Sequence, residues 1–270
     1  MEELSYVSVD YNEGGSHMTV FTCEDRIEDM FTCIYVAWEW ALVHGHDQLR
    51  LEKEPIVQYT LFDQYIHVEP DADKAEKVAR SIRQKISYDA YVTLHYACLS
   101  KADMLDVMYR YLRIGFRVGN KINQMLTDSV VMQMSEIRRT VGNEIHYWRE
   151  FLRFHSVDGK VYVSHFEPKN HVITYVATHF ADRMPSEHWM IIDDTRGVAA
   201  VHPKDGEWYM VTLTNEEQEQ LKETEKYRDS FTDMWKVFFD TIGIQKRKNE
   251  KCQRNMFPIW MRKHATEFQV

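Results

Sequence analysis

The chain has 270 residues and a formal charge of −9, with 44% hydrophobic and 13% aromatic residues. These values exclude an intrinsically disordered protein, which combines low hydrophobicity with high net charge. The acidic balance argues against a protein that coats nucleic acid over its whole surface, but it leaves local basic patches open. The length suits one large domain or two small ones.

The first residues contain a short stretch that resembles cloning sequence. Residues 14–18 read GGSHM, and Gly-Ser-His-Met is what a cleaved expression tag leaves at a cloning site. We therefore expect residues 1–17 to be a tag or cloning scar and the native sequence to start at Met18. The alternative is a natural glycine-rich loop after a first strand, LSYVSVDY. Residues 1–17 hold four acidic residues and no Lys or Arg, so the rest of the chain carries −5.

A mixed, mostly helical N-terminal unit is predicted over residues 18–150. An apolar strand at 18–23 precedes a helix at 25–43, and two short strands lie around Pro55. A helix follows Asp71, and further helices are predicted at about 88–99, 101–117 and 120–153. Apolar residues recur at helical spacing and predict buried stripes at Val78, Ile82 and Ile86 and at Leu105, Met108 and Leu112.

An α+β domain is predicted over residues 151–270. Two alternating runs joined by Asp158-Gly159 predict a hairpin. Asn170 is expected to cap a helix that runs to about residue 184, and HWMIIDD, GVAAVHP and WYMVTL predict three more strands. An acidic helix and a helical, basic tail complete the domain. The fold class is therefore α+β, with a helix-rich N-terminal unit followed by an antiparallel β meander that contains one inserted helix.

Compartment and cofactors follow from what the sequence lacks. It has no signal peptide and no apolar run long enough to span a membrane, so we expect a cytoplasmic protein without a membrane partner. The four cysteines lie far apart and form no Cys-x-x-Cys motif. We therefore expect reduced thiols, no metal site and no cofactor. Walker-type, dinucleotide-binding, zinc-protease and serine-hydrolase motifs are also absent, which lowers the expectation of those activities.

One group of candidate catalytic residues lies in the C-terminal domain. His179 and Arg183 are four residues apart on a predicted helix, and Asp193 closes a predicted strand. With His146 they would supply an acid, a base and anion stabilisation if they converged. The alternative is that they are surface histidines, a helix-end arginine and a turn carboxylate, and that His146 is a core or interface residue.

A second group is basic and lies in the tail. Residues 236–264 hold eight Lys or Arg against two acidic residues, a local charge of +6, with aromatic residues among them. Such side chains can contact phosphates and stack on bases. The alternative is a solvated segment that pairs with the acidic helix at 216–229. The predicted nucleic-acid contacts are Lys246, Arg247, Lys248, Asn249, Gln253, Arg254, Arg262 and Lys263, with support from Arg110, Arg113 and Arg117.

Several blocks of the sequence resemble one bacterial family. They include GNEIHYWREFLRF, PKNHVITYVATHFADRM and KRKNEKCQRNMFPIWMRKHATEF, within a resemblance that runs from Met18 to Phe268. The family consists of DNA metabolism or repair proteins encoded beside a radical-SAM protein. The C-terminal half also resembles a domain found fused to uracil-DNA-glycosylase-like proteins. The resemblance implies DNA repair or modification, without a particular reaction.

Three functions remain in competition. The leading hypothesis is a DNA-binding accessory protein in DNA repair or modification that acts with a radical-SAM partner. The chain lacks the closely spaced cysteines that hold a radical-SAM cluster, so the radical step would belong to the partner. The second hypothesis is an enzyme that acts on DNA bases or backbone through the His/Arg/Asp group. The third is a protein-interaction subunit that does not bind DNA.

Overall fold

The computed structural model of the chain describes residues 17–222, 230–242 and 249–268. The chain divides into two compact units, Met1–Cys98 with Asp103–Ser135, and Leu99–Ala102 with Glu136–Val270. The division falls within a helix, α5 (Ser129–Phe151), whereas the sequence predicted a boundary after residue 150. Within the described ranges, the structure contains no helix with the length and apolar character needed to cross a membrane.

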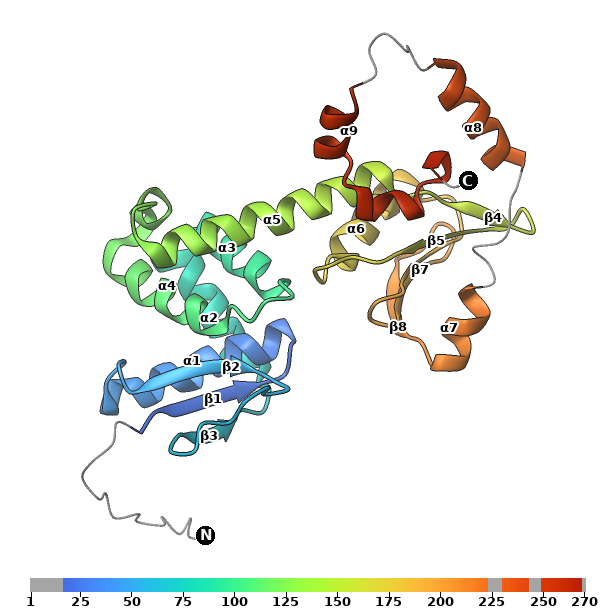
Figure 1. Ribbon diagram of the computed structural model, residues 1–270. Coiled ribbons are helices and arrows are strands. Elements are labelled where there is room, and N and C mark those ends of the chain that lie inside the picture. Colours follow the sequence, from blue (N-terminus) through green and yellow to red (C-terminus); the bar gives the residue numbers. More distant parts are fainter. Residues whose placement is uncertain (1–16, 223–229, 243–248, 269–270) are drawn as a thin grey trace. The chain divides into compact units, whose positions relative to one another are not determined.

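The first unit combines a small parallel sheet with a group of helices. Its strands lie in the order β2-β1-β3, and both neighbours pair with β1 in parallel. β1 and β2 are parallel because a helix, α1, connects them, and α1 lies over the sheet in Figure 1. The elements are β1 (Thr19–Cys23), α1 (Ile27–His44), β2 (Leu49–Lys53), β3 (Gln64–His67), α2 (Ala72–Lys85), α3 (Tyr88–Cys98), α4 (Leu105–Val118) and η1 (Gly119–Gln124).

The core of the first unit follows the predicted apolar stripes. Leu105, Met108 and Leu112 of α4 are buried, as are the three residues predicted on α2 and just beyond its end. Gly115 of α4 leaves room for this packing, because a Cβ atom there would lie 2.7 Å from Cδ1 of Ile86. Local apolar spacing therefore identified the buried faces of both helices.

The second unit is built on a five-stranded sheet in the order β4-β5-β6-β7-β8. The predicted hairpin is present, and Asp158 and Gly159 both have the positive φ angles that a tight hairpin turn requires. The elements are β4 (His155–Val157), β5 (Val161–Phe166), α6 (Ile173–Arg183), β6 (Trp189–Asp193), β7 (Val198–His202), β8 (Tyr209–Thr212), α7 (Asn215–Lys222), α8 (Ser230–Ile242), α9 (Glu250–Met256), η4 (Ile259–His264) and η5 (Thr266–Phe268).

The predicted α+β class is confirmed, and the pairing of β5 with β6 refines it. β6, β7 and β8 form the expected antiparallel meander, but β5 and β6 are parallel. The inserted helix, α6, carries the chain back across the sheet, so β6 starts at the same end as β5. As a result, the carboxyl ends of β5 and β6 lie next to each other, with Phe166 opposite Asp193.

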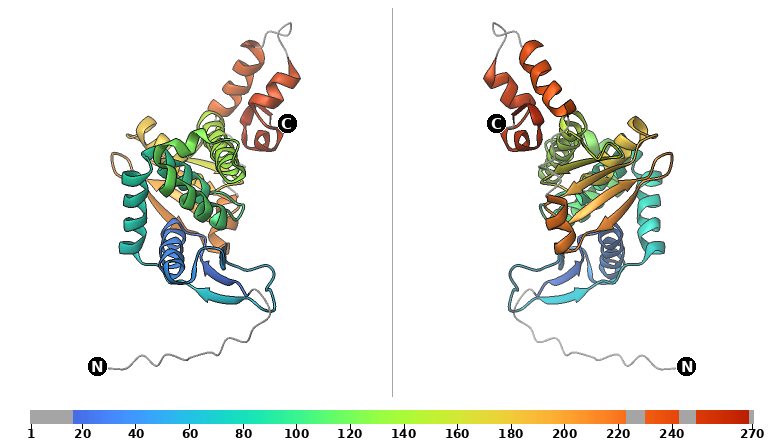
Figure 2. Two further views of the ribbon diagram at one scale, coloured as in Figure 1. Left: turned by 90° about the vertical axis from the view of Figure 1, so that its left-hand side faces the viewer. Right: turned by 90° about the vertical axis from the view of Figure 1, so that its right-hand side faces the viewer.

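Helices pack on both faces of this sheet. Phe180 of α6 and Trp189 of β6 both meet the ring of Phe154. Leu221 of α7 packs with a cluster that includes Ile192. Because Trp189 and Ile192 are an odd number of residues apart on one strand, they point to opposite faces. Figure 2 shows both helices beside the strands.

Candidate nucleic-acid interface

A buried carboxylate holds the loop at residues 167–171, which follows β5. Glu144 of α5 is 5% exposed and accepts hydrogen bonds from the backbone N–H of Lys169 (2.6 Å), from the backbone N–H of Asn170 (3.3 Å) and from the Asn170 side-chain amide (2.5 Å). The Asn170 side-chain oxygen accepts from the N–H of Lys101. The prediction that Asn170 caps α6 is therefore wrong, because its amide group is engaged elsewhere and Val172 occupies the cap position.

A second set of contacts fixes the other side of the loop. The guanidinium of Arg196 donates to the carbonyl oxygens of Pro168 (3.0 Å) and Lys169 (2.8 Å) and pairs with Asp193 (3.0 Å). Asp193 is fully buried and also accepts from the N–H groups of Thr195 and Arg196. Burial raises the pKa of Asp193, and the ion pair with Arg196 opposes that rise. Asp193, a predicted catalytic residue, thus stabilises the turn between β6 and β7.

The anchored loop presents a lysine to a tryptophan. The Nζ atom of Lys169 lies 4.6 Å from the ring centroid of Trp260 in η4. Trp260 meets Trp148 of α5 edge to face, with ring centroids 5.6 Å apart. The ammonium of Lys263, three residues along η4, contacts the carboxylate of Glu167. We call Lys169, Trp260 and Lys263 the lysine–tryptophan surface.

The segment that carries Trp260 is fixed to the unit by buried side chains. Phe257 and Met261 are 4% and 1% exposed. The guanidinium of Arg262 donates to the carbonyl oxygen of Phe257 and lies 4.8 Å from the ring centroid of Phe268. Arg262, a predicted phosphate contact, therefore holds the tail together.

Histidines and carboxylates gather at the adjacent carboxyl ends of β5 and β6. Nδ1 of His165 lies 3.1 Å from both carboxylate oxygens of Asp194. The ring of His155 lies parallel to that of His165, with centroids 6.4 Å apart. Burial, with a contribution from Lys263, lowers the pKa of His264 to about 4, while Glu167 and Asp194 act in the opposite direction. A neutral imidazole therefore lies beside a histidine–carboxylate pair, an arrangement capable of proton transfer.

Sequence reasoning did not select this histidine cluster. His165 and Asp194 are 29 residues apart and His264 lies in the tail, so nothing in their spacing joins them. The available signal was that His165 is the last but one residue of one strand and that Asp194 directly follows another. That signal becomes informative only once the two strands are known to be parallel. Among the described residues, no three His, Cys, Asp or Glu side chains are grouped as metal ligands.

The four predicted catalytic residues are only partly brought together. His179 and Arg183 share a face of α6, and burial, Arg149 and Arg183 together lower the pKa of His179. His146 is exposed on α5 and pairs with Glu150 at 3.1 Å, so it is not a core residue. Within the described ranges, no contact links His179 or Arg183 to Asp193 or His146. The structure therefore does not assemble the four as one site.

The predicted phosphate contacts of the tail differ in their exposure and in the partners of their side chains. Arg254 and Lys263 are exposed and form ion pairs with Glu250 and Glu167. Asn249 instead caps α9, because its side chain accepts from the N–H of Cys252. Gln253 is half-buried on α9. Lys246, Arg247 and Lys248 lie outside the described residues.

The three supporting arginines lie on α4 of the first unit. Arg110 pairs with Asp106 at 2.7 Å, Arg113 pairs with Asp47 at 3.2 Å, and Arg117 is exposed. The formal charge of −9 falls entirely in the first unit, because the second holds 21 basic and 21 acidic residues. The balanced charge of the second unit repels a polyanion such as nucleic acid less than the acidic first unit does.

Most of the residues described in this subsection lie within the part of the chain that one family model matches. A model described as a domain of unknown function, DUF4130, matches residues 102–267. The chain belongs to the DUF4130 family. The DUF4130 match includes the lysine–tryptophan surface, the histidine cluster and the anchored loop. No curated protein and no solved structure matches the chain.

Proposed function

We propose that the C-terminal unit binds single-stranded nucleic acid and that the protein is a DNA-binding accessory in DNA repair or modification. The observation that supports this best is the lysine–tryptophan surface, in which the ammonium of Lys169 lies over the ring of Trp260 and Lys263 follows three residues later in the same short helix. Aromatic rings stack on nucleotide bases, and lysines contact phosphates. On binding, Lys169 would move to a phosphate and leave the ring of Trp260 to a base.

The preference for single strands follows from the stacking step. A base inside a duplex is already stacked on its neighbours, whereas an unpaired base offers a free face to Trp260. Existing ion pairs do not prevent binding, because the pairs of Arg254 and Lys263 are solvent-exposed. Exposed pairs are worth about 0–1 kcal/mol, so a phosphate can replace the carboxylate at small cost.

Binding by charge and stacking predicts a specific pattern of variants. Lys169→Glu should lower the affinity for a labelled oligothymidine about tenfold at ~50 mM salt, measured by fluorescence anisotropy. Lys160→Glu is the matched control, because Lys160 is exposed at the β4–β5 turn, the opposite end of β5. Absence of binding at ~50 mM salt, or equal losses in both variants, would refute the proposal.

The radical-SAM partner is the second part of the proposal and rests on the family resemblance. Co-purification of the two proteins, with and without DNA, tests it. Association that requires DNA supports a shared substrate. Association without DNA, together with a failure to bind oligonucleotides, would instead favour a protein-interaction subunit.

A second candidate function is acid–base catalysis on DNA, and the pairing of His165 with Asp194 beside His264 favours it. Here His264 would exchange a proton with the substrate, and the exposed Arg183, which shares a face of α6 with the half-buried His179, would offer a separate anion contact. Intact, uracil-containing and UV-damaged oligonucleotides should be incubated with the protein and with Asp194→Asn. Strand cleavage or base loss that disappears in the variant supports an enzyme, and unchanged substrates argue against one.

A further inference from the structure

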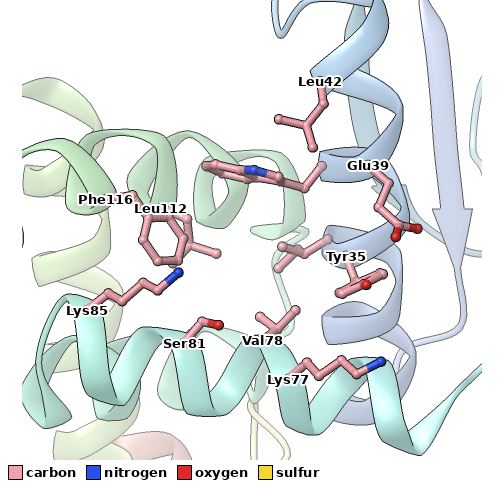
Figure 3. Close-up of a pocket in the computed structure, with 11 residues that line it drawn as sticks. Tyr35, Glu39, Leu42, Lys77, Val78, Ser81, Lys85, Leu112 and Phe116 are labelled. Atoms are coloured by element: carbon pink, nitrogen blue, oxygen red, sulfur yellow. The ribbon is translucent and has the colours of Figure 1, made fainter.

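The first unit contains a pocket that the nucleic-acid proposal does not use. It lies between α1, α2 and α4 and has a volume of about 530 Å³ (Figure 3). Pockets for small molecules typically measure about 300–1,000 Å³ and are mostly apolar with a few polar groups. The lining residues are Ile34, Tyr35, Trp38, Glu39, Leu42, Lys77, Val78, Ser81, Lys85, Leu112 and Phe116.

The walls of the pocket are apolar and held in place by their neighbours. Trp38 of α1 meets Phe116 of α4 edge to face, with ring centroids 5.3 Å apart. Leu112 is almost fully buried beneath them, whereas Leu42 is 73% exposed at the edge. Edge-to-face ring contacts stabilise a fixed arrangement, so the wall is already formed without a ligand.

Three polar side chains of α2 line one side of this apolar space. Lys77, Ser81 and Lys85 are spaced four residues apart and therefore lie along one face of the helix. In Figure 3, the side chains of Ser81 and Lys85 extend from α2 toward Leu112 and Phe116. On the opposite wall, the hydroxyl of Tyr35 donates a hydrogen bond to Glu39. This hydrogen bond raises the pKa of Tyr35.

The cations that line the pocket differ from the others on α2. Lys74 pairs with Asp71, and Arg80 and Arg83 pair with Glu76. Among the described residues, neither Lys77 nor Lys85 forms an ion pair. Within the described ranges, Lys77 and Lys85 are thus the two lysines of α2 that form no ion pair with a carboxylate, and both line the apolar pocket. A ligand that matches this arrangement has an apolar body and an anionic group.

We propose that this pocket binds a small amphipathic anion, with its aliphatic or aromatic body against Trp38, Leu112 and Phe116 and its acidic group at Lys85. The enclosure by three helices favours a small molecule over a protein segment. Because all lining residues belong to the first unit, the inference is independent of nucleic-acid binding.

Calorimetric titration of the full chain with laurate, below its micellar concentration, tests the proposal. We expect one laurate per chain, with weaker binding of dodecanol and weakest binding of dodecyltrimethylammonium, which share its chain length. Lys85→Gln should weaken laurate about tenfold without changing dodecanol, because it removes only the charged contact. Arg80→Gln is the control, since Arg80 lies on the same helix outside the pocket.

A further variant separates this site from nonspecific uptake. Phe116→Ser should weaken laurate and dodecanol together, because it removes part of the apolar wall, and circular dichroism checks that the variant folds. No binding of laurate, binding of several molecules per chain, or equal affinity of laurate for Lys85→Gln and the parent chain would each overturn the proposal.

Discussion

Arg153 and Glu267 lie 114 residues apart and form a two-pronged ion pair that fixes the C-terminal segment to the end of α5. Nη2 of Arg153 donates to one carboxylate oxygen at 2.7 Å and Nε donates to the other at 3.3 Å. Trp235 of α8 also donates to Glu267, at 3.1 Å. The Glu267 side chain is only 4% exposed. The orientation of the segment that carries Trp260 therefore depends on this pair.

Glu267→Gln should lower the free energy of unfolding by about 2–3 kcal/mol, because it leaves the Arg153 charge partly buried without its partner. Urea titration followed by circular dichroism measures the change. Glu250→Gln removes an exposed pair with Arg254 and should cost less than about 1 kcal/mol. Equal effects of the two substitutions would contradict a structural role for the Arg153–Glu267 pair.

Glu144→Gln should destabilise the loop at 167–171. A carboxamide keeps only one acceptor atom, so at least one of the buried N–H groups of Lys169 and Asn170 loses its partner. We expect a loss of about 2–3 kcal/mol and faster hydrogen exchange at these two amides. Glu150→Gln, on the exposed side of the same helix, should leave their exchange rates unchanged. Unaltered exchange in Glu144→Gln would disprove the anchoring role.

Stability should depend on pH through His264. Burial lowers its folded pKa to about 4, below the value of about 6.5 in an unfolded chain, so the unfolded state binds more protons between these values. The contribution of His264 to the free energy of unfolding is fully present above pH ~6.5. It is lost as the pH falls toward 4, and the loss is on the order of 2–3 kcal/mol. Thermal unfolding from pH 7 to pH 4 should show this loss, and His264→Phe should show a smaller one. If the stability of His264→Phe and of the parent chain fell equally between pH 7 and pH 4, His264 would not be the source of the pH dependence.

Asn249 offers a local test of helix capping. Asn249→Ala should destabilise the first turn of α9 by about 1 kcal/mol, whereas Asn249→Asp retains an oxygen that can accept from the N–H of Cys252. Hydrogen exchange of the Cys252 amide reports the difference. If alanine and aspartate increased exchange to the same extent, the side chain would not be a cap.

The extent to which the sequence predicted the fold varies with the range of the interaction. The β4–β5 hairpin follows from Asp158-Gly159, and the buried face of α4 follows from its apolar spacing, because both depend on neighbouring residues. Asn170 shows where local rules fail. Its amide can cap a helix, but the buried Glu144, 26 residues earlier, provides a stronger, charge-assisted contact.

By itself, the sequence determined the α+β class, the positions of most helices and strands, and the basic character of the tail. Only the tertiary structure decided which polar side chains meet. His165 joins Asp194 because β5 and β6 are parallel, and Lys169 reaches Trp260 because Glu144 and Arg196 fix its loop. Strand direction and long-range packing depend on the free energy of the whole folded unit, so residue spacing along the chain does not encode them.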